Sequence, residues 1–111
     1  MPKNTLQETE QLTDAMYYIL LSLVEPRHGY AIMKYIAELS NHTIHMGPGT
    51  LYTLLKKLSN ANWIMQTSTD DRTKTYQITE TGLQILRTEI KRRKHMVEDG
   101  IRVLKEAGYE K

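Results

Sequence analysis

The chain has no cysteine, which excludes a disulfide framework, a thiolate nucleophile and a cysteine metal site. It also lacks any apolar run near the roughly 18–20 residues that a membrane span needs, and its polar N-terminus has no signal-peptide core. We therefore expect a cytoplasmic protein without membrane attachment. Its 111 residues suffice for one domain with a single modest core.

A strong charge of either sign is absent too. Fifteen Lys and Arg stand against 13 Asp and Glu, which gives a net charge of +2. With a pI near 8.8, the chain is compatible with nucleic-acid binding, but many dedicated nucleic-acid-binding domains are more basic. Overall charge therefore does not decide between classes of function.

Nothing in the sequence indicates an enzyme. No combination of Ser, His and acid is typical of a nucleophile with its base, and no pair of carboxylates lies in an apolar setting. His42 and His45 are three residues apart, but no third ligand at a convincing spacing accompanies them. We therefore expect no catalytic residues, no metal and no cofactor.

Apolar spacing predicts two helices in the first part of the chain. The first begins at Thr13 or Asp14, either of which can cap it, and stops at 25–26, next to a proline. We expect it to be the buried central helix, with an apolar side of Met16, Ile19, Leu20, Leu23 and Val24. The second opens around 28–30, ends near 40–41 and is expected to bury Ile32, Met33, Ile36 and Leu39. The β-prone segment 43–46 is predicted to form one small strand.

The segment from Gly47 to Leu58 is the most informative part of the chain. Pro48 suits the first position of a helix, where its missing N–H costs nothing. An apolar stripe follows at positions i, i+3, i+4 and i+7, namely Leu51, Leu54, Leu55 and Leu58. We predict that this helix runs to about Ala61 and that Asn62 then takes a left-handed conformation.

The opposite side of this helix has small residues, hydroxyls and ammonium groups, and no acid. It carries Gly49, Thr53, Lys56 and Asn60, flanked by Thr50, Tyr52 and Lys57. A solvated helix face would normally include Glu or Asp. A DNA major groove, in contrast, needs small residues, donors to base edges and cations near phosphates. The pattern therefore predicts a DNA recognition helix.

Two β-prone runs follow Trp63, where the apolar period changes from 3.6 to 2. They span 64–69 and 74–79, and the polar link 70–73 joins them as a hairpin. Three helices followed by a hairpin is the order of a winged helix-turn-helix domain. We therefore expect a mainly α fold with a small β-hairpin, in which residues 1–79 form the DNA-binding domain.

A final helix is predicted from Thr79 or Thr81 to about Ala107, with Gly108 at its end. About 25 residues make a helix of about 37 Å, which overshoots a small winged domain. Near-heptad spacing gives it an apolar seam, interrupted by Arg93 and Gly100, of Leu83, Leu86, Ile90, Val97, Ile101 and Leu104. We assign residues 80–111 as a dimerisation helix, whose contacts with a second subunit are Leu86, Ile90, Val97, Ile101 and Leu104.

Three motifs occur in order along the chain, namely His28-Gly29-Tyr30, Pro48-Gly49-Thr50-Leu51-Tyr52 followed by Leu55 and Leu58, and the wing end 72–79, which continues into Thr81-Gly82-Leu83 and Leu86. Over about residues 12–90 these motifs resemble those of the PadR family of bacterial transcriptional regulators. Two departures from the family pattern are Asn62-Trp63 in place of the usual Gly-Leu and Ile78 in place of the common Leu. The single long helix after the wing is similar to the short branch of the family.

The resemblance implies a homodimeric repressor that binds an inverted-repeat operator in double-stranded DNA, often beside its own gene, and is released by a small planar effector. It also implies that Tyr30 lies against the DNA backbone. Arg72 and Lys74 are the cations of the wing, and the neighbouring Asp70 and Asp71 partly cancel their electrostatic field. Of these two cations we favour Arg72 as the DNA contact. The predicted DNA-binding residues are Tyr30, Gly49, Thr50, Tyr52, Thr53, Lys56, Arg72 and Lys74.

The same residues have a plainer structural interpretation. Thr53 and Lys56 also fit a solvated helix face, while Tyr30 and Tyr52 also fit tyrosines packed on the domain. A winged-helix module that binds protein without binding DNA is therefore the alternative function. An enzyme is a weaker third class, because the sequence offers no nucleophile or metal constellation.

Three further features are interpreted as structural. Trp63 fits a hydrophobic anchor better than a stacking surface for a planar effector. The basic run 91–94 is interpreted mainly as a solvated helix face. Core filling is a better interpretation than a soft ligand pocket for Met16, Met33, Met65 and Met96.

Overall fold

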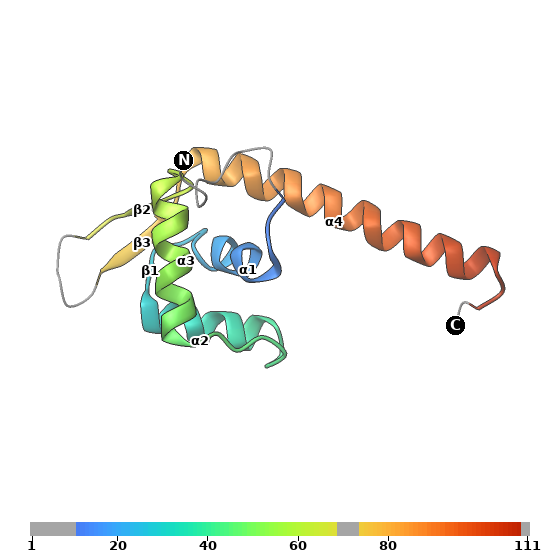
Figure 1. The fold of residues 1–111 in the computed structure, drawn as a ribbon, viewed down its shortest axis with the longest axis horizontal. Coiled ribbons are helices and arrows are strands. Elements are labelled where there is room, and N and C mark those ends of the chain that lie inside the picture. Colours follow the sequence, from blue (N-terminus) through green and yellow to red (C-terminus); the bar gives the residue numbers. More distant parts are fainter. Residues whose placement is uncertain (1–10, 69–73, 110–111) are drawn as a thin grey trace, which may run out of the picture.

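The computed structural model of the chain describes residues 11–68 and 74–109. Three strands form one antiparallel sheet in the order β1 (Arg27–His28), β3 (Thr75–Ile78) and β2 (Ile64–Gln66). This is the predicted winged helix-turn-helix with a long C-terminal helix (Figure 1). The elements follow in the order α1 (Asp14–Ser22), β1 (Arg27–His28), α2 (Gly29–Leu39), α3 (Pro48–Asn60), β2 (Ile64–Gln66), β3 (Thr75–Ile78) and α4 (Glu80–Glu106).

Local side-chain and turn signals set the helix ends close to their predicted positions. The Thr13 hydroxyl accepts a hydrogen bond from the Met16 N–H at 3.2 Å and so caps α1. The Thr79 hydroxyl caps α4 in the same way. Asn62 takes a left-handed φ of 65° after α3, which confirms the predicted turn. Gly108 ends the last helix with a φ of 85°.

Only α1 ends clearly earlier than predicted, at Ser22 and not beside Pro26. The Ser22 hydroxyl donates to the Ile19 carbonyl at 2.7 Å, and Arg27 Nη1 donates to the Ser22 carbonyl at 2.5 Å. Because these side chains satisfy carbonyls of the last turn, the helix can end before the proline forces it to.

The core surrounds α1, which lies between α4 on one side and α2 and α3 on the other (Figure 1). Its residues Ile19 and Leu20 are fully buried, which confirms α1 as the central helix. Trp63 is 1% exposed and is therefore the predicted hydrophobic anchor. The buried apolar residues are Leu12, Met16, Ile19, Leu20, Leu23, Ile32, Ile36, Leu51, Leu55, Leu58, Trp63, Ile64, Ile78, Ile85 and Leu86.

Two residues assigned to apolar helix faces are exposed. Val24 is 47% exposed because α1 has already ended, so the helical period no longer turns this residue inward. Leu39 is 46% exposed at the last position of α2. Met33, also predicted as buried, is half-buried. The prediction of burial was thus wrong for Val24 and Leu39, and it overstated the burial of Met33.

The predicted hairpin is present, but its strands are shorter than predicted and the third strand lies elsewhere. In the hairpin, Ile64 pairs with Ile78 and Gln66 with Tyr76. The segment 43–46 forms no strand. The third strand is instead β1, just before α2, which pairs with β3. A β-prone run becomes a strand only where it meets a free edge, and β1 meets the edge of β3.

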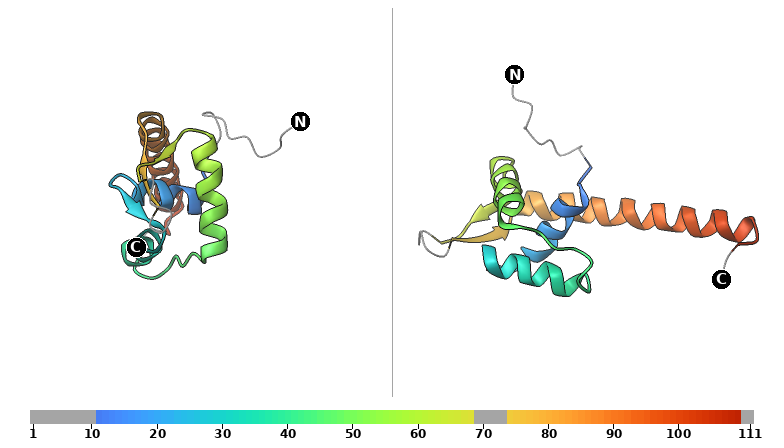
Figure 2. Two further views of the ribbon diagram at one scale, coloured as in Figure 1. Left: turned by 90° about the vertical axis from the view of Figure 1, so that its left-hand side faces the viewer. Right: turned by 60° about the horizontal axis from the view of Figure 1, so that its bottom comes forward.

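The first half of α4 packs against α1, and the second half projects away from the winged domain (Figure 2). Its start is fixed to the turn after α3, because the Thr79 hydroxyl donates to the Asn62 carbonyl at 2.6 Å and the Thr79 N–H donates to the Trp63 carbonyl at 3.0 Å. From Lys94 onward every described residue is exposed. None of the described helices combines the length and the apolar character that crossing a membrane requires.

Candidate nucleic-acid interface

Helix α3 has the two opposite sides that the sequence predicts. Leu51, Leu55 and Leu58 are buried in the core. The outer side is exposed along its whole length and holds Gly49, Thr50, Tyr52, Thr53, Lys56 and Asn60. Since α3 contains no acid, this exposed side combines small residues, hydroxyls, an amide and an ammonium group. Gly47 is the N-cap and offers no side chain to the first N–H groups of the helix, which leaves them for an external anion.

The start of α2 lies against the start of α3. Tyr52 packs its ring over Gly29, which is buried and has no room for a side chain. Tyr52 nevertheless stays 51% exposed, so it packs and faces solvent at once. Tyr30 is 69% exposed, so the alternative interpretation of this residue as a partly buried tyrosine packed on the domain is wrong. Tyr52 is therefore part of the outer side of α3, and Tyr30 is exposed next to Gly29, the residue that Tyr52 contacts.

The wing joins this surface through the sheet. Strand β1 lies directly before α2, and its pairing places His28 opposite Thr75 and Arg27 opposite Tyr76. Burial raises the pKa of the Tyr76 hydroxyl, and the neighbouring Tyr52 raises this pKa further. Tyr52 thus lies between the start of α2 and the wing strand β3, a role that the sequence pattern did not reveal.

Arg27 on β1 contacts both α1 and α2. Its guanidinium lies 3.8 Å from the centre of the Tyr35 ring on α2, while its Nη1 holds the end of α1. Strand β1 is therefore tied to both neighbouring helices. No sequence signal points to this role of Arg27, because a two-residue strand has no periodicity to detect.

Cations on this surface come from different elements. Lys34 on α2, Lys56 on α3 and Lys74 before β3 are all exposed. The single acid of α2, Glu38, lies near the far end of that helix from Tyr30. Arg72 lies outside the described residues, together with Asp70 and Asp71, so its predicted contact with DNA stays a prediction.

The methionines and histidines that the sequence offers as candidates for a ligand pocket or a metal site are not brought together into such a site in the described part of the chain. Met16 is buried in the core, whereas Met65 and Met96 are exposed, so core filling applies fully to Met16 alone. The rings of His42 and His45 stack with centres 5.8 Å apart. In the part of the chain that the structure describes, no three His, Asp or Glu side chains are grouped to hold a metal ion.

The apolar seam of α4 divides into a buried and an exposed part. Leu86 is only 4% exposed in the core of its own chain, so its assignment to a subunit contact is corrected. The remaining predicted contact residues, Ile90, Val97, Ile101 and Leu104, are 42–61% exposed. Met96 and Val103 lie beside them and are equally exposed, although the sequence analysis did not include them.

The basic run 91–94 is not a uniformly solvated face. Lys91 and Lys94 are exposed as expected. Arg92 and Arg93 are half-buried and form ion pairs with Glu89, which is 4% exposed. The interpretation of this run as a solvated face was therefore wrong for its two arginines.

Comparison with known proteins identifies the family. Residues 19–88 match the transcriptional regulator PadR-like family. A crystal structure of a PadR family transcriptional regulator from Eggerthella lenta is 30% identical, has a TM-score of 0.64 and covers 83% of this chain and 81% of that one. The structure of RosR from H. salinarum is 25% identical, also has a TM-score of 0.64 and covers 86% of this chain and 96% of that one.

A curated relative in sequence is a 37.1 kDa protein of a Streptomyces fradiae transposon, which is 32% identical over 77 residues. The matched part makes up 68% of this chain and 22% of that protein, so the chain spans about a fifth of the length of this relative. The family matched above consists of transcriptional regulators and not of enzymes. With a family match over residues 19–88 and a winged fold similar to solved members, the chain belongs to the PadR-like family of transcriptional regulators.

Proposed function

We propose that this chain is a sequence-specific DNA-binding regulator that acts as a homodimeric repressor of transcription. The observation that carries the proposal is the exposed, acid-free outer side of α3, which is joined to the start of α2 and to the wing. Such a surface fits DNA, with the recognition helix in the major groove and the flanking elements on the phosphates.

Each part of this surface has a role in the proposal. Thr53 and Lys56 lie midway along the outer side of α3 and reach base edges or the nearest phosphates. Gly49 and Thr50 are small and let the start of the helix approach the DNA backbone. The first N–H groups of α3 then bind a phosphate at the positive end of the helix dipole.

Tyrosine hydroxyls and wing cations supply further phosphate contacts. More than half of the surface of Tyr52, on α3, and of Tyr30, at the start of α2, is exposed. Lys74 is exposed at the start of the wing strand β3. Arg72, in the link between the two wing strands, is proposed as the stronger of the two wing contacts, because a guanidinium binds phosphate oxygens in a bidentate manner.

A second copy of the chain is the partner that fits α4. Ile90, Val97, Ile101 and Leu104 need apolar contacts that their own winged domain does not provide. A twofold dimer through this helix would present two recognition helices about 34 Å apart, one turn of DNA. The matching target is an inverted repeat in double-stranded DNA.

Repression and release by a small planar effector complete the proposal. Their support is the resemblance of the chain to the PadR family, of which it is a member. A dimer bound over a promoter excludes the polymerase. An effector releases the dimer if it binds the DNA-free form more tightly than the DNA-bound form.

A mobility-shift assay with DNA from upstream of the chain's own gene tests the proposal. We expect a specific shift that weakens steeply as salt rises, because each phosphate contact releases counterions. The alternative function, a winged-helix module that binds protein without DNA, predicts no shift at any salt concentration. The proposed function would be contradicted if, at low salt, the chain bound neither the upstream DNA nor any sequence selected from a random library.

A further inference from the structure

Glu89 is the only charged residue that is buried in the described part of the chain. A buried carboxylate is strongly unfavourable unless cations and hydrogen bonds satisfy it. Arg92 Nε and Nη2 lie 3.1 and 2.5 Å from its two carboxylate oxygens, and Arg93 Nε lies 2.6 Å from one of them. Burial alone would raise the pKa of Glu89, but the hydrogen bonds from Arg92 and Arg93 hold this pKa below its ordinary value. Glu89 is therefore a carboxylate satisfied from its own helix.

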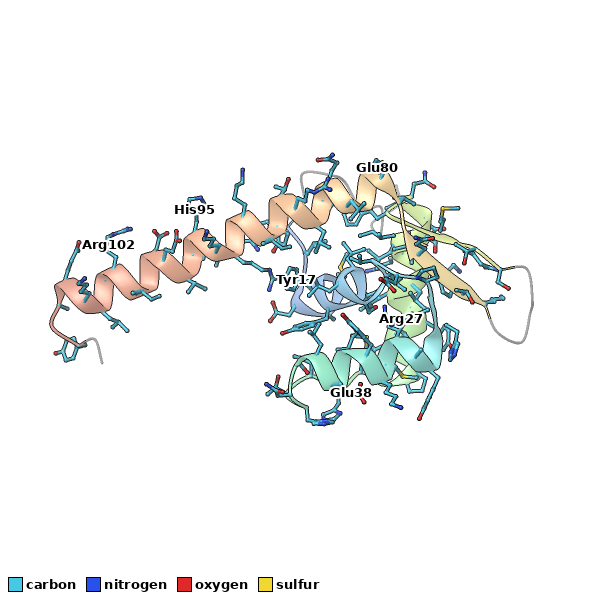
Figure 3. The ribbon with its side chains drawn as sticks, turned by 180° about the vertical axis from the view of Figure 1, so that it is seen from behind. Tyr17, Arg27, Glu38, Glu80, His95 and Arg102 are labelled. Carbon is cyan, nitrogen blue, oxygen red and sulfur yellow. The ribbon has the colours of Figure 1, made fainter. Side chains whose placement is uncertain are left out.

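Arg93 also reaches beyond α4. Its Nη1 donates to Asp14 Oδ1 at 2.9 Å, and its Nη2 donates to the Leu12 carbonyl at 3.0 Å. Its guanidinium also lies 4.4 Å from the centre of the ring of Tyr17, which Figure 3 labels on α1. Each of the three guanidinium nitrogens thus holds a different partner, which a lysine could not reproduce with a single point charge. We call Asp14, Tyr17, Glu89 and Arg93 the α1–α4 clamp.

The α1–α4 clamp lies where α4 leaves the winged domain. Because every described residue from Lys94 onward is exposed, Arg93 marks the end of the packed part of the helix. The free part, up to Glu106, is about 20 Å long at 1.5 Å per residue. A tilt of about 10° at its base would move its tip by about 3.5 Å, close to the rise of about 3.4 Å per base pair of DNA.

We infer that the α1–α4 clamp fixes the direction of α4 and thereby selects the spacing between the two half-sites that a dimer recognises. This inference rests on the proposed function, since spacing matters only if α4 joins two DNA-binding domains. With a rigid base, α4 transmits one geometry to both recognition helices. With a loose base, the two domains would adapt to several spacings, and the preference for one of them would disappear.

The variant Arg93→Gln tests this inference, with Arg92→Gln as its matched control. Both substitutions remove one positive charge and one partner of Glu89. Only Arg93 bonds to α1, whereas the other contact of Arg92 is Met96, on α4 itself. Because Glu89 keeps one guanidinium in either variant, both are expected to fold.

The first measurement is the distance between α2 and the free part of α4. The chain has no cysteine, so spin labels can be placed on Glu38→Cys and Arg102→Cys alone. Dilution with unlabelled protein restricts the signal to pairs within one chain. We expect Arg93→Gln to broaden the distance distribution and Arg92→Gln to keep that of the parent.

The second measurement is the affinity for inverted repeats that differ only in spacer length. The parent and Arg92→Gln should prefer one spacer, and Arg93→Gln should lose that preference. An unchanged distance distribution in Arg93→Gln, or equal broadening in Arg92→Gln, would overturn the inference. If Arg93→Gln does not fold, Asp14→Asn removes only the α1 carboxylate and should shift both measurements in the same direction.

Failure of the proposed function has a different signature. A parent chain that binds no inverted repeat at any spacing would contradict the proposed function. The distance measurement, which needs no DNA, would still decide whether the α1–α4 clamp fixes α4.

Discussion

The ring of Tyr52 on α3 packs directly on the backbone of Gly29 on α2. A Cβ atom built on Gly29 would overlap the hydroxyl oxygen of Tyr52 and lie 2.8 Å from its Cζ, closer than real Cβ atoms approach other heavy atoms. A larger residue at position 29 would therefore fit only if the end of the Tyr52 side chain shifted, and the contact links the start of α2 to the outer side of α3. Two separate family motifs, His28-Gly29-Tyr30 and the segment that ends in Tyr52, meet in this one contact.

The contact makes a direct prediction for Gly29→Ala. The added methyl group must push the hydroxyl end of the Tyr52 ring away. Because Tyr52 is half-exposed and can shift, we expect a decrease in the free energy of unfolding of about 1 kcal/mol, the lower end of the range for overpacking. Thermal unfolding measures this decrease. In a Tyr52→Ala background the same substitution should cost much less, whereas Gly49→Ala, which has open space around its Cβ, should not destabilise the fold. Equal decreases with and without the Tyr52 ring would contradict the packing argument.

The outer side of α3 is tested by Thr53→Ala and Lys56→Ala. Each is expected to weaken specific operator binding by about 1–3 kcal/mol without changing the fold, because both side chains are exposed. Mobility shifts on operator and unrelated DNA measure the difference. Lys91→Ala removes the same charge from an exposed position of α4 and serves as the control. If Thr53→Ala and Lys56→Ala both bind as tightly as the parent, DNA binds elsewhere.

Contacts of the wing with DNA should contribute to affinity independently of the DNA sequence. Arg72→Ala and Lys74→Ala are each expected to lower affinity for operator and unrelated DNA alike, with the larger effect at Arg72. The slope of log affinity against log salt should fall by about 0.9 for each phosphate that the variant no longer binds. A variant that fails to bind the operator but keeps the full salt slope would indicate base reading or a structural role instead.

The proposed dimer is tested by a double substitution, Val97→Glu with Ile101→Glu. Both side chains are more than half exposed, so the change should leave the winged domain folded but bring unpaired carboxylates into the subunit contact. Sedimentation should then show a monomer that no longer binds an inverted repeat tightly.

The matched control for this dimer test is His95→Glu with Arg102→Glu. Figure 3 shows both side chains on the edge of α4 turned away from α1 and α2. This control also adds two carboxylates and should remain a dimer. A dimer that persists after the Val97 and Ile101 substitutions would show that the interface lies elsewhere than on α4, with α1 around Tyr17 and Leu21 as the next candidate.

Glu89 should make stability depend on pH in the acid range. Its pKa in the folded chain lies below the ordinary value of 4.5, so it stabilises the fold above that value. As pH falls below about 4.5, the unfolded chain takes up the proton first, and this contribution disappears. Glu89→Gln should cost about 1–3 kcal/mol at neutral pH and should flatten the acid part of the stability curve. Glu106→Gln, on the exposed end of α4, should leave the curve unchanged, and a parallel decrease in both variants would contradict a specific role of Glu89.

Several features follow from the sequence because their physical causes are local. The caps at Thr13 and Thr79 and the left-handed Asn62 depend on a few neighbouring residues, so the helix boundaries could be predicted. The two sides of α3 follow from the helical period alone. The division of that helix into a buried Leu stripe and an exposed, acid-free side was therefore predictable before the fold was known.

Other features depend on which elements meet in space. Strand β1 exists because β3 offers it an edge, whereas the β-prone segment 43–46 has no such edge and forms no strand. The burial of Leu86 and Glu89 depends on where α4 crosses α1, which no periodicity gives. The hydrogen bonds from Arg93 to Asp14 and Leu12 join residues 79 and 81 positions apart. The sequence alone therefore determined the helices, every helix end except that of α1, and the exposed, acid-free side of α3, because these depend on neighbours along the chain. The third strand, the contact of Tyr52 with Gly29 and the direction of α4 were decided only by tertiary packing, because their partners are distant in sequence.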